Sequence, residues 1–98
     1  MKTISFVCKF EEVAVKTAKL ESVIRTMACN CWDWDMLPAV VAPINMGEEM
    51  MALVTINYDW GFKFPVPQNF EEMLGNSPEK KSLRKSYVDS MRESWGKE

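Results

Sequence analysis

The 98-residue chain contains no histidine. A histidine base serves most serine and cysteine nucleophiles, and structural zinc sites usually combine cysteine with histidine, so this absence excludes the commonest catalytic triads and zinc sites. No apolar run approaches the roughly 18 residues that a helix needs to span a bilayer. Charges at Lys9, Glu11 and Glu12 also interrupt the N-terminal segment too early for a signal peptide. We therefore expect a cytoplasmic protein without a membrane segment.

Cysteine is scarce as well, with three residues at Cys8, Cys29 and Cys31. In a protein that is not exported, an odd number of cysteines indicates reduced thiols rather than a disulfide framework. The three thiols, with Asp33 or Asp35 as a fourth ligand, have the donor atoms for a metal site. However, Cys29 and Cys31 are closer in sequence than the usual spacing of roughly two to four residues, so we favour free thiols without a metal or a cofactor.

The chain has little excess charge of either sign, because its formal net charge is −2. Residues 1–76 hold six Lys and Arg against ten Asp and Glu, whereas residues 77–98 hold six against four. An acidic body repels a phosphate backbone, so direct nucleic-acid binding is not expected as the main activity. The basic cluster near the C-terminus instead suits a second contact with a protein partner, and it comprises Lys80, Lys81, Arg84 and Lys85.

Hydrophobic residues make up 47% of the chain, enough for one core and a single globular domain over residues 1–98. Residues 50–64 alternate with a period of two over the longest stretch, which predicts a central strand. The face of that strand expected to be buried carries Met50, Ala52, Val54, Ile56, Tyr58 and Trp60. Residues 2–10 alternate in the same way. Residues 37–44 predict a third strand, which Pro38 and Pro43 confine to a sheet edge.

Helical spacing replaces the alternation in three other segments. Residues 11–29 carry apolar side chains at steps of three and four, a short helix follows Asn69, and Ser77-Pro78 is a typical helix start. The apolar stripe of the last helix is expected to pack on the sheet and comprises Leu83, Tyr87, Val88, Met91 and Trp95. The predicted order is strand, helix, strand, strand, short helix, helix. The fold class is therefore α+β, with a three-stranded, mainly antiparallel sheet and two or three helices on one face.

Acidic and aromatic residues alternate before the third strand, at Trp32, Asp33, Trp34 and Asp35. In an extended segment the tryptophans lie on one face and the acids on the other, so either the acids or the tryptophans are presented outward. If the segment meets Asp59, the carboxylates form a hydrolytic pair or a magnesium site. A solvated acidic face is the simpler interpretation.

The chain is rich in aromatic residues and methionine, with four Trp, five Phe, two Tyr and eight Met. A domain of this size buries only about 60% of its unfolded surface or slightly more, and Trp and Met are over-used where one protein grips another. Candidate anchors are Trp32, Trp34, Trp60 and Trp95. The proline-stiffened segment beside them costs little entropy to dock and contains Phe64, Pro65 and Pro67.

These features favour a non-enzymatic interaction protein that binds a larger protein. Small domains of this general character are common among phage and mobile-element proteins that inhibit or redirect a host enzyme, such as a DNA-processing nuclease or a CRISPR effector. One alternative is a small enzyme or metal-binding module built on Asp33, Asp35, Asp59 and the cysteines. Another is a self-associating structural subunit, and the oligomeric state stays open.

Overall fold

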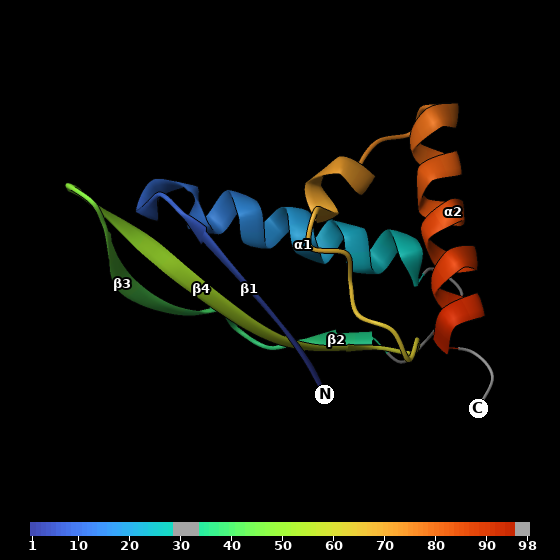
Figure 1. Ribbon diagram of the computed structural model, residues 1–98, viewed down its shortest axis with the longest axis horizontal. Helices are drawn as coiled ribbons and strands as arrows, with labels where there is room; N and C mark the ends of the chain where they lie inside the picture. The colour runs from blue at the N-terminus through green and yellow to red at the C-terminus, as the bar shows by residue number, and fades with distance from the viewer. Residues whose placement is uncertain (29–33, 96–98) are drawn as a thin grey trace.

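The computed structural model describes residues 1–28 and 34–95. A long central strand, β4 (Glu49–Trp60), pairs antiparallel with every other described strand. On one side lies β1 (Lys2–Cys8), and on the other β3 (Val40–Met46) pairs with the first half of β4 and β2 (Trp34–Met36) with the last three residues (Figure 1). The predicted α+β fold is confirmed. The predicted count of three strands needs one correction, because four strands fill three positions across the sheet.

The broken edge next to β4 has a local cause in the proline positions. Successive residues of an antiparallel strand direct their backbone groups alternately to the two sides, and Leu37 N donates to Asn57 O at 2.9 Å. Odd-numbered residues of β4 therefore bond to β3 and β2. Since Pro43 pairs with Ala52, its nitrogen faces the free edge and costs no ladder bond. The expected edge position of this strand is confirmed.

Two glycines bound the central strand, which ends at Trp60 and not at the predicted residue 64. Met46 pairs with Glu49, so Gly47 and Glu48 form a two-residue hairpin turn in which Gly47 adopts φ 72°. Gly61 follows the strand directly with φ 77° and turns the chain out of the sheet. Both positions need a left-handed backbone, which a residue with a Cβ adopts only at a cost.

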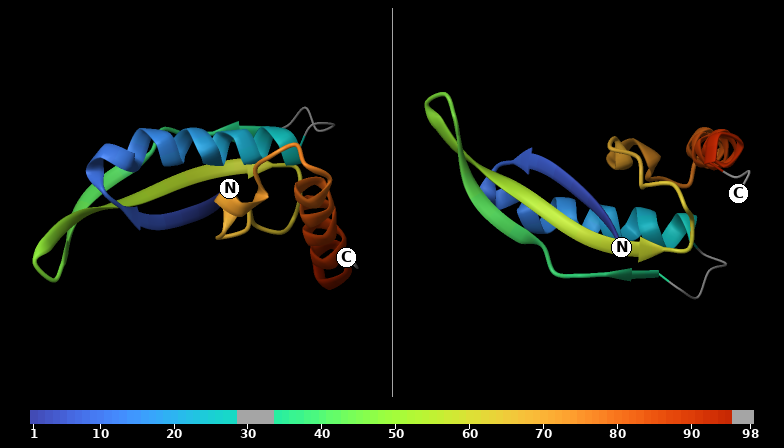
Figure 2. Two further views of the ribbon diagram at one scale, coloured as in Figure 1. Left: turned by 90° about the horizontal axis from the view of Figure 1, so that it is seen from above. Right: turned by 60° about the horizontal axis from the view of Figure 1, so that its bottom comes forward.

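One face of the sheet is covered by the helix α1 (Val13–Met27), which the short 3₁₀ helix η1 (Phe10–Glu12) introduces (Figures 1 and 2). We call this the inner face. Its side chains and those of α1 form the core, whose fully buried members are Ile4, Cys8, Leu20, Val23, Ile24, Ala52, Val54, Ile56, Tyr58 and Trp60. The predicted buried face of β4 is confirmed from Ala52 to Trp60, whereas Met50 lies on the hairpin beyond the helix and is exposed.

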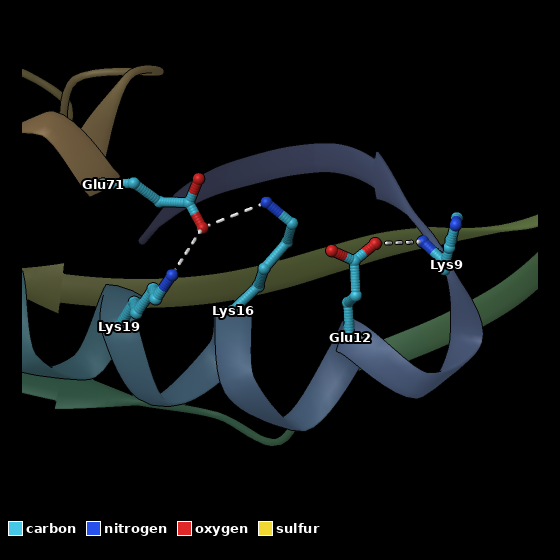
Figure 3. A network of polar contacts seen from close by, with 5 residues as sticks. All are labelled: Lys9, Glu12, Lys16, Lys19 and Glu71. Atoms are coloured by element: carbon cyan, nitrogen blue, oxygen red, sulfur yellow. Dashed lines mark hydrogen bonds and ion pairs between the residues drawn. The ribbon is translucent and has the colours of Figure 1, made fainter.

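The first strand ends earlier than predicted. Its alternation suggests strand to residue 10, but β1 stops at Cys8 and Phe10 belongs to η1, where its side chain is exposed. The backbone amide of Lys9 donates to Glu12 Oε1 at 3.1 Å, and this bond stabilises the entry into the helix (Figure 3). The acidic pair at Glu11 and Glu12 thus lies in the first helical turn, as expected from the helix dipole.

Buried polar atoms of β4 hold the segment that follows it. Trp60 Nε1 donates to Phe64 O at 2.8 Å, and Val66 N donates to the Tyr58 hydroxyl at 2.8 Å. Burial raises the pKa of Tyr58, so the hydroxyl stays protonated and accepts this bond as a neutral group. Phe64, Val66 and Pro67 are buried. The extended, proline-stiffened segment is therefore part of the core and not a free arm.

The second 3₁₀ helix, η2 (Phe70–Met73), packs on α1 through an ion-pair network. Glu71 Oε1 accepts from Lys16 Nζ at 3.0 Å and lies 3.5 Å from Lys19 Nζ (Figure 3). The hydrogen bond from Lys16 lowers the pKa of Glu71, and the same bond raises the pKa of Lys16. The predicted short helix after Asn69 is thus present, as 3₁₀ rather than α-helix, with Phe70 and Met73 buried beneath it.

We predict that Glu71→Gln lowers the free energy of unfolding by about 0.5–1 kcal/mol at pH 7, a small value because the Glu71 side chain is 37% exposed. A lowered folded-state pKa contributes stability above the usual value of 4.5, and this contribution is lost as the pH falls through the folded pKa. The difference between the parent and the variant should therefore shrink as the pH falls below 4.5. Urea unfolding at pH 7 and pH 3 measures the difference, and an unchanged gap at pH 3 would contradict it.

The last helix, α2 (Pro78–Trp95), stands at one end of the molecule (Figure 1). Ser77 Oγ accepts from Lys80 N at 3.2 Å, which confirms the predicted helix start. The helix packs through Tyr87, Val88 and Met91, yet none of its residues is fully buried. Leu83 and Trp95, the two ends of the predicted stripe, are exposed. The expectation that the whole stripe packs on the sheet is therefore wrong for those two positions.

Deletion of the residues after Ser77 should lower the free energy of unfolding by about 3 kcal/mol and leave a cooperative transition. Three half-buried side chains are lost, each at about half the value of a fully buried one. Differential scanning calorimetry of the shortened chain tests this. A broad, non-cooperative thermal transition would show instead that the core does not fold without α2.

Candidate protein-interaction surface

The face of the sheet opposite α1 has no described helix across it (Figures 1 and 2). The strand registers place on this face every second residue of each strand. Cross-strand bonds agree with this placement, because Thr3 Oγ1 donates to Asn57 Oδ1 at 2.6 Å and the hydroxyls of Ser5 and Thr55 lie 3.3 Å apart. We call this surface the open face. It comprises Thr3, Ser5, Val7, Asp35, Val40, Ala42, Ile44, Met46, Glu49, Met51, Leu53, Thr55, Asn57 and Asp59.

The open face is apolar in its middle and towards the hairpin. Val40 is 62% exposed, Val7 and Ala42 are exposed, and Leu53 and Met51 are half-buried. Isolated apolar side chains on a surface are ordinary, but a contiguous strip across three neighbouring strands is typical of a contact surface. The sheet therefore offers one side to the core and the other to a partner.

The hairpin of β3 and β4 extends this surface beyond α1 (Figures 1 and 2). Its exposed apolar side chains lie on both of its faces and include Met46 on the open face and Val41 and Met50 on the other. Methionine adapts its shape to irregular surfaces, which suits a contact that forms after folding. Glu48 and Glu49 make the tip acidic.

At the opposite end of the open face two carboxylates stand directly across from each other. Asp35 pairs with Asp59 in the register of β2 and β4. Like charges in this position destabilise a sheet, and the N-terminal ammonium lies 3.6 Å from Asp59 Oδ1. Asp35 Oδ1 accepts from Met36 N at 2.9 Å, which orients it without neutralising it. The sheet thus tolerates a local charge conflict at an exposed position.

The acidic character of the open face has a signal in the sequence that is easily overlooked. Residues 26–62 contain five Asp and Glu and no Lys or Arg. All six Lys and Arg of residues 1–76 lie outside this stretch, so a net charge taken over residues 1–76 averages the local acidic excess away. No strand position of the open face carries a basic side chain.

Several of the predicted partner-binding residues lie elsewhere. Trp60 has no exposed surface, Phe64 is 2% exposed and Pro67 is buried. These three residues were predicted as partner anchors, but they are buried and cannot contact a partner. Trp60 lies on the inner face of β4 and therefore fills the core. Pro65 is half-buried and its carbonyl accepts from the Tyr87 hydroxyl at 2.8 Å. The segment from Phe64 to Pro67 therefore packs within the fold and is not free to dock on a partner.

The acids and tryptophans of the second strand divide between the faces. Trp34 lies on the inner face, half-buried beside Trp60, with the Arg25 guanidinium 5.7 Å from its ring centre. Asp35 lies on the open face. Of the two arrangements considered from sequence, the structure therefore has the acid outward. The other members of the motif, Trp32 and Asp33, lie outside the described residues.

The basic cluster of α2 is largely occupied by contacts within the chain. Arg84 donates to the carbonyls of Met73 and Gly75 at 2.7 and 2.8 Å. Lys80 donates to Glu72 O at 2.9 Å, and Lys85 forms an exposed ion pair with Asp89, four residues on in the helix. The cations in the first turns of the helix, which the dipole disfavours, thus dock it on η2. Lys81 remains exposed.

An open pocket of about 320 Å³ lies where the turn after β4 meets the end of α2. Phe62 forms part of its lining, and the Arg92 guanidinium lies 5.4 Å from the centre of that ring. Trp95, which is 45% exposed, lines the other side. Among the four predicted tryptophan anchors, Trp95 is the most accessible one that the structure describes.

The proposed cysteine metal site does not converge where the structure describes its members, although Asp35 and Asp59 of the proposed carboxylate site do lie opposite each other. Cys8 is buried on the inner face opposite Ala52, whereas Asp35 lies on the open face opposite Asp59. Cys8 and Asp35 cannot ligate one ion. Burial raises the pKa of the Cys8 thiol, with the Glu12 carboxylate adding to the effect, so it is a core thiol rather than a reactive one. Cys29 and Cys31 lie outside the described residues.

We predict that the purified protein contains no stoichiometric zinc. Residues 1–28 and 34–95 contain no cluster of three metal-ligating side chains, and Cys29 and Cys31 alone make a poor tetrahedral site. Elemental analysis of the purified protein after dialysis against metal-free buffer without a chelator measures the content. About one zinc per chain, lost when Cys29 and Cys31 are replaced by serine, would overturn the prediction.

Comparison with protein families, curated proteins and solved structures finds no match to this chain. Over the part of the chain that the structure describes, no helix combines the length and apolar character needed to cross a membrane. The function must therefore be argued from the geometry of the surface.

Proposed function

We propose that the chain is a non-enzymatic, cytoplasmic interaction protein that binds a larger protein through the open face of its sheet. The observation that carries the proposal is the contiguous apolar strip around Val40, Ala42 and Leu53, which no described element covers. A sheet with one face on a core and the other in water usually presents polar side chains outward. Apolar side chains at these positions support a role in binding.

The partner class that we propose is a host enzyme that handles nucleic acid, such as a DNA-processing nuclease or a CRISPR effector. Such enzymes hold phosphate backbones with Lys and Arg, and an acidic surface is attracted to the same groups. A small protein seated there would inhibit or redirect the enzyme. The proposed origin in a phage or mobile element rests on this general character and on the small size of the chain.

The test replaces two exposed residues at the centre of the open face. Val40→Lys with Ala42→Lys should leave the thermal midpoint nearly unchanged, since lysine is well tolerated on edge strands. It should weaken binding at least tenfold, because burying two added charges against an apolar contact is unfavourable. The partner is first captured with the parent protein and identified by mass spectrometry, and affinities are then measured with purified components.

A matched control changes the same residue types on the opposite side of the molecule. Val15 and Ala18 are exposed on α1, so Val15→Lys with Ala18→Lys adds equal charge away from the open face. This control should bind as the parent does. Parent-like binding by the open-face variant, together with loss of binding in the control, would place the interface on the helices and refute the proposal.

A further inference from the structure

We infer that the partner meets the open face with an apolar strip that carries Lys or Arg at both of its ends, and that a second copy of this chain is not the occupant. This inference rests on the proposed function and specifies the chemistry of the partner. It follows from where the acids lie relative to the apolar strip, from the state of the sheet edges and from the size of the face.

Acids lie at both ends of the open face along the central strand, and Thr55 and Asn57 separate the apolar strip from the Asp59 end. Glu49 begins β4 at the hairpin, and Asp59, with Asp35 opposite it, lies one residue from its end. Ten residues separate Glu49 from Asp59 in the sequence, which corresponds to roughly 33 Å of strand at about 3.3 Å per residue. A complementary surface therefore has its basic groups about 30 Å apart, with its apolar contacts on the side nearer Glu49.

A second copy does not provide this complement. When two open faces pack with a two-fold axis along β4, each end meets the same end of the other copy. When the axis crosses β4, Glu49 of one copy meets Asp35 and Asp59 of the other. Both arrangements bring acids against acids, and like-charge juxtaposition across an interface is strongly unfavourable. The N-terminal ammonium near Asp59 offsets only part of this.

The edges of the sheet favour contact by the face rather than by added strands. On the β3 side Pro43 directs its nitrogen to the free edge and offers no donor there, as derived from the register. On the β1 side Gln68 Nε2 already donates to Ser5 O at 2.7 Å. A strand from another protein would find both ladders interrupted, whereas the face is continuous.

The size of the face gives charge a decisive part in binding. Three strand positions about 4.8 Å apart and roughly 33 Å long cover on the order of 500 Å² on one partner. The two partners together would bury on the order of 1,000 Å², the low end for a specific interface. At this size, electrostatic complementarity determines which partner binds and how fast.

The experiment uses the full isotope-labelled protein and two synthetic eleven-residue peptides of alternating valine and threonine, about 36 Å long when extended. One peptide carries a pair of lysines at each end, and the other carries a pair of glutamates at each end. NMR titration should show amide shifts along β4 and about tenfold tighter binding of the lysine peptide, since each exposed pair contributes a factor of roughly 1.5 to 5. The preference should shrink in 500 mM salt.

Two triple variants assign the effect. Glu49→Gln with Asp35→Asn and Asp59→Asn should abolish the preference for the lysine peptide. The matched control, Glu11→Gln with Glu79→Gln and Glu93→Gln, removes equal charge from exposed helix positions and should retain it. Sedimentation of the parent should show a monomer at 100 µM in 50 mM and in 500 mM salt.

Equal affinity for both peptides, no binding of either at millimolar concentration, or an unchanged preference in the open-face triple variant would overturn the inference. A dimer that Val40→Lys with Ala42→Lys dissociates would overturn it too, because the occupant would then be a second copy. None of the peptide results bears on whether the open face binds protein, since that is decided by partner binding of the lysine variants.

Discussion

Everything in this fold depends on the alternation of β4. All other described strands pair with it and not with one another, and its even-numbered side chains from Ala52 to Trp60 have no exposed surface. A one-residue slip would bring its odd-numbered residues, including Asn57 and Asp59, against α1 and expose Tyr58 and Trp60. The register is therefore specified by burial along the whole strand, and the remaining elements take their positions from it.

Polar atoms at the end of β4 also position the segment that follows it in the chain. The Tyr58 hydroxyl and the Trp60 indole nitrogen each bond a backbone group of the segment that leads to η2. From there polar contacts add to the burial of Phe70 and Met73: Lys16 bonds to Glu71, and Arg84 bonds to the carbonyls of Met73 and Gly75. The molecule thus has a strongly packed sheet-and-helix body and a helix α2 that is held at its surface.

The helical side and the open face of the molecule therefore differ in their chemistry. The basic residues of α1 and α2 include those that hold the helical elements together. The open face of the sheet carries acids and no basic side chain at its strand positions, and no described element covers its apolar strip. A partner with complementary charge and an apolar centre would satisfy both features at once, which is why we connect them in one contact surface.

Most elements of this protein could be predicted from local sequence signals, although β2 and the end of β1 could not. Alternation predicted β4 and its buried face, helical spacing and the Ser77-Pro78 pair predicted two helices, and Pro43 indicated an edge strand. Which aromatic residues are accessible, and what the cations contact, depends instead on how the elements pack. Trp60 and Trp95 are alike in sequence character, yet one fills the core and the other lies on the surface. Likewise, Arg84 meets carbonyls that the chain brings to it only after folding. Such pairings depend on how distant segments pack, and no periodicity within one segment records them.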